Sequence, residues 1–407
     1  MRILILAPSE ICYHPRLLKA ADFFIKKGDK VVVFNSITGL ASKEVYDKTT
    51  GIRNWVLYEN DISKRTFGSK IRWLFSSVVF KLNYLFLKFT GKWLFFQYGL
   101  SRSFILFPSD LKKQAFDYIY INLVDTLPLA SSLQKKTGAA IIYDCQEYFK
   151  GQSKGFNDIQ YKWVVEAENK YASLCRVVLG TTAVMVKKLE EDFGSAPSYF
   201  RVRNLPLKSD IAFRENSDST LKLIWHGLNI VPENVRGVHI LLQAVSVCKT
   251  PVHLYLQGHI NGINKAKLDE LMAKLNIAHL VTVIDAADPD CIVESLIKYD
   301  VGLAGELAAE ENQMLTSSNK LFEYIYAGLA VIMPDLPGLA ETVNDYSVGE
   351  LYEQGDFQQL ADKIDSINNN RVTLNGFKNA SRKAAKEELF WENDFGKVWQ
   401  HLNKQVR

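Results

Sequence analysis

The stretch "TSSNKLFEYIYAGLAVIMPD", residues 316–335, combines a polar start, a helical pattern, a glycine and a strand pattern. Ser317 and Ser318 are both suitable N-caps, and Gly328 is typical of the position just after a helix. The predicted helix buries an apolar stripe made of Leu321, Phe322, Ile325 and Leu329. The stretch therefore predicts a helix, a turn and a buried strand, which is the repeating unit of a doubly wound α/β sheet.

The same helix places Asn319, Lys320 and Glu323 on a different side from the apolar stripe. A helix N-terminus presents unpaired N–H groups and a partial positive charge, so together with Lys320 it could bind a phosphate. Glu323, one turn in, could accept hydrogen bonds from a ribose diol. The alternative is an exposed ion pair between Lys320 and Glu323 at i, i+3 spacing. This stretch alone does not separate the two interpretations.

Strand patterns alternate with amphipathic helical patterns along nearly the whole chain. In the first half the expected strands are Arg2–Ala7, Lys30–Asn35, Asp117–Asn122, Ala139–Asp144, Arg176–Gly180 and Tyr199–Arg203. In the second half they are Leu221–His226, Val252–Gln257, Leu280–Ile284, Asp300–Ala304 and Ala330–Met333. A length of 407 residues exceeds what one ordinary core holds. We expect an α/β protein of two doubly wound, Rossmann-like domains facing each other across a cleft, with ligands beyond the strands' carboxyl ends.

The domain boundary is expected near residue 205, because the polar stretch 207–220 has little apolar periodicity and is typical of a linker. The predicted domains are therefore 1–205 and 206–388. In the second domain, a strand is followed by the predicted turn His226-Gly227. Arg236 then precedes the glycine that opens an apolar helix, and Gly258 ends another strand. Glycine lets backbone approach a ligand, and arginine binds phosphate with two hydrogen bonds. Each of these signals is weak alone.

Taken in order, the motifs resemble the GT-B glycosyltransferases, specifically the retaining group that includes many bacterial polysaccharide and lipopolysaccharide enzymes. They are "HPRLLKAADFFIKKGDKVVVF", "IIYDCQEYF", "FRVRNLP", "HG…VRGVHILLQAV", "YDVGLA", "NKLFEYIYAGLAVIMPDLPGLAETV", "GDFQQLADKI" and "LFWENDF". The resemblance implies a nucleotide-sugar site in the second domain, with Glu323 on the ribose and Arg236 and Lys320 near the diphosphate. It adds Asn319, Ser318, Gly227 and Gly258 as expected nucleotide contacts. It also implies that the last helix, within 389–407, packs back onto the first domain.

The chain departs from the family pattern at two functional positions. Leu315 stands where an acid that contacts the donor sugar is common, and Glu306, Glu310 or Glu311 could substitute for it. Gln146 stands where a histidine is usual, and a glutamine can hydrogen-bond a sugar hydroxyl but cannot take a proton at neutral pH. In the family's reaction the leaving phosphate is thought to help deprotonate the acceptor. Stabilising that phosphate is then the main catalytic task, for which Arg236, Lys320 and the helix N-terminus are suited, and Gln146 is the third residue expected to be catalytic.

The segment from residue 62 to residue 109 carries eight Lys or Arg, no Asp or Glu, and 13 of the chain's 48 aromatic residues. If it is helical, Lys70, Lys81, Lys88 and Lys92 form one basic stripe within about 40°. We expect contact with an anionic membrane surface, as in an interfacial helix. The alternative is a set of core helices with a solvated lysine face, divided at Gly91. No nucleic-acid-binding motif accompanies the charge, so we expect no nucleic-acid partner.

Five cysteines without CxxC spacing indicate a reducing compartment. The first strand is too short for a signal peptide, and no uncharged apolar run is long enough to cross a bilayer. We expect a cytoplasmic location, peripheral on the cytoplasmic face of the membrane. Nothing in the sequence requires a metal or another cofactor.

The sequence predicts a retaining glycosyltransferase that moves a sugar from a nucleoside diphosphate-sugar to a membrane-associated glycan or lipid-linked acceptor, in cell-surface polysaccharide or glycolipid synthesis. Two alternatives stay open. One is a catalytically weakened sugar-nucleotide-binding scaffold, since fold does not fix function. The other is a GT-B sugar-nucleotide epimerase, which would need further acids and histidines in the site.

Overall fold

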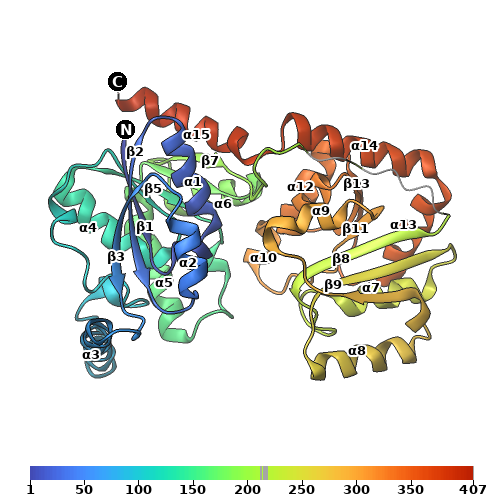
Figure 1. Ribbon diagram of the computed structural model, residues 1–407, viewed down its shortest axis with the longest axis horizontal. Coiled ribbons are helices and arrows are strands. Elements are labelled where there is room, and N and C mark those ends of the chain that lie inside the picture. Colours follow the sequence, from blue (N-terminus) through green and yellow to red (C-terminus); the bar gives the residue numbers. More distant parts are fainter. Residues whose placement is uncertain (211–212, 214–218, 407) are drawn as a thin grey trace. The chain divides into compact units, whose positions relative to one another are not determined.

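The computed structural model describes residues 1–210, 213 and 219–406 (Figure 1). The chain divides into two compact units. The first contains Met1–Thr181, Met185–Val202 and Phe395–Arg407, and the second contains Thr182–Val184 and Arg203–Asp394. The main division thus follows Val202, a little before the expected boundary at 205, and the second unit extends beyond residue 388. Part of the predicted linker 207–220, namely residues 211–212 and 214–218, lies outside the described residues.

The first unit is built on a seven-stranded parallel sheet with the order β3-β2-β1-β4-β5-β6-β7. The strands are β1 Arg2–Ala7, β2 Lys30–Ile37, β3 Val56–Asp61, β4 Tyr118–Ile121, β5 Ala140–Asp144, β6 Val177–Gly180 and β7 Ser198–Arg201. The helices include α1 Pro15–Lys26, α2 Lys43–Thr50, α3 Phe67–Thr90, α4 Leu127–Thr137, α5 Asp158–Tyr171 and α6 Ala183–Phe193. The strand order reverses between β1 and β4, so right-handed crossovers place α1 and α4 on opposite faces of the sheet (Figure 1).

The second unit has a six-stranded parallel sheet with the order β10-β9-β8-β11-β12-β13. Its strands are β8 Leu221–Asn229, β9 Val252–His259, β10 Val281–Ile284, β11 Val301–Leu303, β12 Ala330–Pro334 and β13 Gly349–Tyr352. Its helices are α7 Val238–Val247, α8 Gly262–Lys274, α9 Ile292–Leu296, α10 Glu311–Leu315, α11 Asn319–Tyr326, α12 Pro337–Tyr346, α13 Phe357–Asn369 and α14 Arg371–Glu387. The order reverses between β8 and β11, which is where ligands bind in such sheets.

The predicted α/β class with two doubly wound units is confirmed, and each predicted strand is present, β1 with the predicted ends and the others with shifted ends. Two strands were missed, β3 and β13, and both are edge strands. The predicted turn after His226 is wrong, because β8 continues through Gly227 to Asn229. A Cβ at Gly258 would lie 2.5 Å from the carbonyl oxygen of Gly227, so these glycines let β8 and β9 approach each other.

Helix α15 (Trp391–Val406) contributes its residues from Phe395 onward to the first unit. The ring of Phe395 packs edge-on against Phe24 with the ring centroids 5.4 Å apart. The indole nitrogen of Trp399 donates a hydrogen bond of 2.8 Å to Oδ2 of Asp29. These contacts join the end of the chain to α1 and to the turn that follows it.

The basic segment forms one 24-residue helix, α3, which ends at Gly91 in the left-handed conformation with φ 67°. Gly91 therefore ends the helix as the sequence indicated. A second helix does not follow it: the chain makes a short 3-10 turn at Phe96–Tyr98. The predicted stripe of four lysines is wrong for Lys92, because that residue lies beyond the end of α3.

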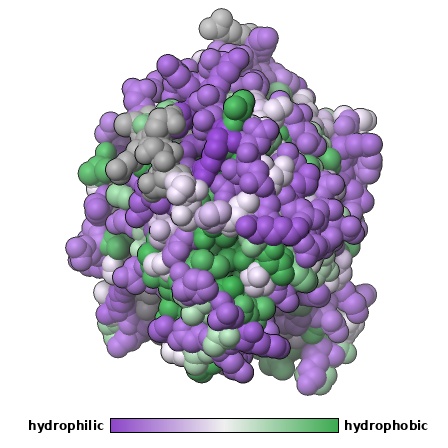
Figure 2. All heavy atoms as spheres, turned by 90° about the vertical axis from the view of Figure 1, so that its right-hand side faces the viewer, coloured by the Kyte–Doolittle hydropathy of each residue, from purple (hydrophilic) through white to green (hydrophobic). Residues whose placement is uncertain are grey.

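Among the described residues, no helix has the length and apolar character needed to span a membrane. Figure 2 shows one face of the molecule, which is mainly hydrophilic with a group of hydrophobic side chains below its centre.

Candidate active site

Three segments of the second unit meet at the point where its strand order reverses. The loop after β8 runs to Gly237, which opens α7, and the loop after β11 begins with Ala304, Gly305 and Glu306. Gly237 has φ 65°, and a Cβ on it would lie 1.7 Å from the carbonyl oxygen of Gly305. The N–H of Leu307 donates to the carbonyl of Val235 at 2.9 Å. Only glycine permits this contact, which brings Arg236 and Glu306 into the same site.

The third segment is α11, whose N-cap is Ser318 and whose C-terminus is followed by Gly328 with φ 71°, as predicted. Its side chains are more deeply buried than a single apolar stripe requires, and even Lys320 is only 5% exposed. The exposed position that the ion-pair alternative requires of Lys320 is therefore not observed. The helix packs against β11 and β12, so its N-terminus lies at the carboxyl edge of the sheet.

Lys320 and Glu306 form a buried ion pair. Nζ of Lys320 lies 2.6 Å from Oε1 of Glu306, and the two side chains are 6% and 16% exposed. Burial acts to raise the pKa of Glu306, but the charge and hydrogen bond of Lys320 outweigh it, with Arg236 adding to the effect, so the pKa is lowered. The other carboxylate oxygen, Oε2, is buried and has no hydrogen-bond partner.

Glu323 is paired with a residue of β8 and not with Lys320. Its Oε2 lies 3.1 Å from Nε2 of His226, whose ring also packs edge-on against Tyr324. The hydroxyl of Tyr324 accepts a hydrogen bond from the backbone N–H of His226 at 3.2 Å. The exposed i, i+3 ion pair between Lys320 and Glu323 is thus excluded, since each side chain has a different partner.

Two other polar atoms at this site are buried without a hydrogen-bond partner, namely Nε1 of Trp225 and Oγ of Ser317. Buried polar groups in folded proteins are nearly always paired, with protein, water or ligand. Together with Oε2 of Glu306, these atoms mark a place prepared for a polar ligand.

The remaining predicted residues of this unit are placed as follows. The guanidinium of Arg236 is exposed, while its backbone N–H donates to Oδ1 of Asn234 at 2.8 Å. Oγ of Ser318 lies 3.4 Å from Oε1 of Glu306. Asn319 accepts a hydrogen bond from the side chain of Asn204.

Of the three acids considered as substitutes at the missing position, Glu306 is the one that lies in this site. Glu310 instead caps the N-terminus of α10 through a capping box. Glu311 is exposed in the first turn of the same helix, and Leu315 ends that helix half-buried.

The first unit has its own polar cluster at the carboxyl edge of its sheet, where its strand order reverses. Nε2 of His14 lies 2.8 Å from Oγ of Ser9, and Nδ1 lies 3.4 Å from the amide nitrogen of Asn122. Burial lowers the pKa of His14 to about 4, against the opposing charge of Glu10, so the ring is neutral at pH 7. The sequence interpretation missed this cluster. The "HPR" at the start of α1 was its visible signal, although nothing there shows that Asn122 lies nearby.

Gln146 follows β5 at the same edge and is half-buried. Asp144, just before it, is buried and accepts two hydrogen bonds from Arg16, one of them from Nε at 2.9 Å. It also accepts one from the hydroxyl of Tyr120 at 2.7 Å. The acid of this motif therefore holds the sheet edge together, and Gln146 is left as the residue available to a ligand.

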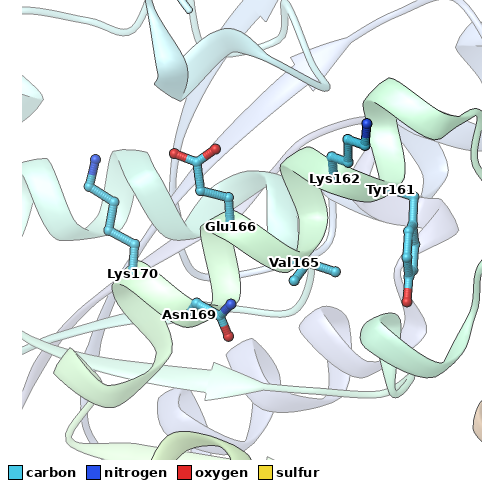
Figure 3. Close-up of a pocket in the computed structure, with 6 residues that line it drawn as sticks. All are labelled: Tyr161, Lys162, Val165, Glu166, Asn169 and Lys170. Carbon is cyan, nitrogen blue, oxygen red and sulfur yellow. The ribbon is translucent and has the colours of Figure 1, made fainter. Parts of the chain in front are cut away.

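A groove of ≈ 550 Å³ lies along α5, lined by Tyr161, Lys162, Val165, Glu166, Asn169 and Lys170 (Figure 3). All six residues come from one helix face, and Lys162, Glu166 and Lys170 alternate in charge at i, i+4 spacing. This pattern is typical of a solvated helix face. The groove lacks the converging buried polar groups found beside β8 and β11, so it is not the candidate site.

No group of three or more potential metal-binding side chains occurs within the described parts of the chain. The arrangement beside β8 and β11 offers the exposed Arg236 and the N-terminus of α11. It also offers two acids, Glu306, whose charge is balanced by Lys320, and the half-buried Glu323. Its charges and hydrogen-bonding groups are suited to a ligand that joins a diphosphate to polyhydroxylated groups, and a doubly wound sheet with this arrangement at its reversal point is consistent with the GT-B class.

Comparison with known proteins agrees with this class. Residues 221–370 match the family model described as Glycosyl transferases group 1. No curated protein matches the chain in sequence. The predicted resemblance and the predicted enzyme class, glycosyltransferase, are confirmed.

Solved structures share the fold over the full chain. HepE of Anabaena in complex with UDP is 14% identical, with a TM-score of 0.67, covering 99% of this chain and 100% of its own. Sucrose-phosphate synthase of Thermosynechococcus elongatus is 13% identical, with a TM-score of 0.66, covering 100% and 99%. TarM of S. aureus is 12% identical, with a TM-score of 0.66, covering 99% and 98%. The predicted GT-B fold is thereby confirmed.

Proposed function

We propose that this protein is a retaining glycosyltransferase that transfers a sugar from a nucleoside diphosphate-sugar to a membrane-associated glycan or lipid-linked acceptor, in the synthesis of a cell-surface polysaccharide or glycolipid. The observation that carries the proposal is the buried Lys320–Glu306 pair beside Arg236 and Glu323, where the strand order reverses. Related folds have been solved with UDP, UDP-glucose, or UDP with α-GlcNAc-glycerol. WaaB, another similar structure, is a lipopolysaccharide outer core galactosyltransferase.

The diphosphate is proposed to bind between the guanidinium of Arg236 and the N-terminus of α11, with Ser318 and Asn319 at its edge. Arg236 can form two parallel hydrogen bonds with phosphate oxygens, and the free N–H groups of the helix add a partial positive charge. Lys320 completes the positive side of the site. Because its charge is shared with Glu306, it allows a carboxylate to lie close to a diphosphate without strong repulsion.

The ribose is proposed to bind at Glu323. This carboxylate is 20% exposed and is oriented by His226, whose ring lies edge-on to Tyr324. A carboxylate accepts hydrogen bonds and donates none, so it suits the two hydroxyls of a ribose.

The donor sugar is proposed to contact the free oxygen of Glu306. Oε1 is fixed by Lys320, while Oε2 is buried without a partner and can accept a hydrogen bond from a sugar hydroxyl. Glu306 would then replace the acid missing at Leu315, although it comes from the loop after β11.

In the proposed mechanism the bond between the sugar and the leaving diphosphate breaks as the acceptor hydroxyl attacks from the same face. The leaving phosphate takes the acceptor's proton, and Arg236 and the helix N-terminus stabilise the negative charge that develops. Gln146 is proposed to orient a sugar hydroxyl from the first unit, since an amide cannot act as a base. The mechanism needs no cofactor beyond the donor itself, and no metal ion.

We further propose that the enzyme works as a peripheral protein at the cytoplasmic face of an anionic membrane, which it contacts through residues 62–109, and that it has no nucleic-acid partner. The absence of acidic residues from this segment supports a preference for anionic lipid, and the lysines of α3 are exposed. A lipid-linked acceptor is consistent with such a location.

Turnover of UDP-glucose, by transfer or by hydrolysis, tests the catalytic proposal. Arg236→Ala and Glu323→Ala should each lower kcat/KM by at least about tenfold, the loss of one good charged contact. The matched controls, Lys267→Ala and Glu270→Ala, remove exposed charges on α8 and should leave turnover unchanged. Full activity in Arg236→Ala and Glu323→Ala would refute the site assignment. Donor binding without turnover in the wild type would favour the scaffold, and conversion of the donor to an epimer would favour the epimerase.

A further inference from the structure

Helix α3 carries its polar and apolar residues on the opposite sides from those expected in a soluble protein. Its buried residues are all polar: Ser69, Ser76, Ser77 and Asn83. Apart from Lys70, Arg72, Lys81 and Lys88, its exposed large residues are apolar: Phe67, Ile71, Leu74, Phe75, Val78, Leu82, Leu85, Phe86 and Phe89. At 100° per residue, these nine side chains fall within an arc of about 120°. We call this surface the outer arc of α3.

Two of the four buried polar residues bond to the rest of the first unit, while Ser69 and Ser76 bond within α3 and its N-cap. Asn83 donates to the carbonyl of Phe95 at 3.0 Å and accepts from the N–H of Phe95 at 2.8 Å. Oγ of Ser77 accepts from Arg102 at 2.6 Å. The inner side of α3 is therefore fixed to the protein by specific hydrogen bonds, and the orientation that leaves the outer arc exposed is built into the fold.

Two of the basic residues in this region take part in the same attachment. Nζ of Lys64 lies 3.9 Å from the ring centre of Trp73, and the guanidinium carbon of Arg102 lies 5.2 Å from it. Trp73 points to the inner side of the helix and is half-buried. Such stacking of cations on an indole ring stabilises the arrangement further.

The exposed basic residues of α3 lie along the margins of the outer arc. Lys70, Lys81 and Lys88 fall within about 20° of one another on one margin, and Arg72 lies beyond the other margin. All four are exposed, and residues 62–109 contain no acid. Lysine and arginine stems can extend along apolar surroundings while the charged group stays at the polar boundary.

We infer that α3 lies in the plane of an anionic bilayer surface, with its outer arc among the acyl chains and its basic margins at the level of the lipid phosphates. The inference rests on the proposed membrane location and adds which face enters the bilayer. The 24 residues of the helix span about 36 Å. Apolar burial then supplies most of the attachment, and the basic margins supply the preference for anionic lipid.

A second copy of this chain is the other occupant that an apolar surface could have. Two outer arcs facing each other would bring together basic margins that contain no compensating acid. Like charges at such an interface are unfavourable, whereas lipid phosphates neutralise them. The charge pattern therefore favours a bilayer over a dimer.

Flotation of the full-length protein with vesicles tests the inference, using phosphatidylcholine alone and phosphatidylcholine with about one third phosphatidylglycerol. The double variant Phe75→Ser/Leu82→Ser should bind anionic vesicles at least about tenfold more weakly than the wild type at both low and high salt. The double variant Lys81→Gln/Lys88→Gln should lose only the part of binding that salt removes. Ile263→Ser, at a 73% exposed apolar residue of α8, is the matched control and should bind like the wild type.

Flotation of the Phe75→Ser/Leu82→Ser variant equal to that of the wild type would overturn the inference. So would a wild-type dimer in sedimentation velocity that this variant dissociates, without vesicle binding by either. Flotation needs no donor or acceptor, so failure of the proposed catalysis leaves this test intact. UDP binding to the same variants, measured separately, reports whether they are folded.

Discussion

Nζ of Lys320 lies 2.6 Å from Oε1 of Glu306, so a lysine in the first turn of α11 and an acid in the loop after β11 form one buried pair. Neither residue is a free charge. The pair holds Oε2 of Glu306 at the edge of the site, unpartnered and beside Arg236. The proposed sugar-nucleotide site of the second unit depends on this pair.

Lys320→Met should destabilise the protein by about 2–3 kcal/mol, because it leaves a carboxylate in a mostly buried place without its partner. The loss should fall somewhat short of that for complete burial, since Glu306 is 16% exposed. Urea unfolding measures it. The double variant Glu306→Gln/Lys320→Met should recover part of the lost stability. A loss of unfolding free energy in the double variant greater than the sum of the losses in the two single variants would contradict the pairing.

The contribution of the pair to stability should depend on pH in the acid range. The pKa of Glu306 is lowered in the folded protein from its ordinary value of 4.5. The unfolded chain therefore takes up its proton first as pH falls, so the stabilisation is present above about pH 4.5 and is lost below it. We expect the difference in unfolding free energy between the wild type and Glu306→Gln/Lys320→Met to shrink between pH 6 and pH 3. The slope should correspond to at most about one extra proton bound by the unfolded wild type. An unchanged difference would show that Glu306 is not ionised in the pair.

Gly237→Ala should disrupt the site more than an ordinary glycine substitution does. The residue has φ 65°, and a Cβ there would lie 1.7 Å from a backbone oxygen of Gly305. We expect a loss of about 2 kcal/mol or more in unfolding free energy and weaker UDP binding. Gly262→Ala, in α8 with nothing within 4 Å of the added Cβ, is the control and should have little effect. Equal effects of the two substitutions would argue against the close loop contact.

His14 should stay neutral throughout the physiological range, because burial lowers its pKa to about 4. Its ring NMR signals, assigned by comparison with His14→Gln, should not titrate between pH 5.5 and pH 8, roughly the range in which ordinary histidines titrate. A midpoint near pH 6.5 would show that the ring is solvated and that the contacts with Ser9 and Asn122 do not form. If His14 stays neutral as predicted, any dependence of activity on pH in that range comes from another group.

Much of the fold could be predicted from the sequence, because buried parallel strands are continuous apolar runs and α11 has clear start and stop residues. The missed strands, β3 and β13, lack this signal: β3 reads "VLYEND" and has one buried residue, and β13 has four residues with one buried. Both are edge strands that use polar side chains, so their composition resembles that of a loop.

The candidate site was predicted in part. Arg236, Lys320 and Glu323 were identified, but their partners Glu306 and His226 come from other loops and strands. A pattern along one helix predicts neighbours at i, i+3 or i+4, and it cannot show a contact made across the sheet edge. The same limit applies to α3: its sequence showed an amphipathic basic helix, but the side that packs on the protein is set by hydrogen bonds from Asn83 and Ser77.

The central claim is that the second unit binds a nucleoside diphosphate-sugar through Glu323, Arg236 and Glu306. Calorimetric titration of the full-length protein with UDP and with UDP-glucose tests it most directly. We predict that Glu323→Ala and Arg236→Ala weaken the binding of both ligands by at least about tenfold, since both residues are proposed to contact the nucleotide part. Glu306→Gln should bind UDP nearly as the wild type does and lose the additional affinity for UDP-glucose. Wild-type affinity for both ligands in all three variants would contradict the account.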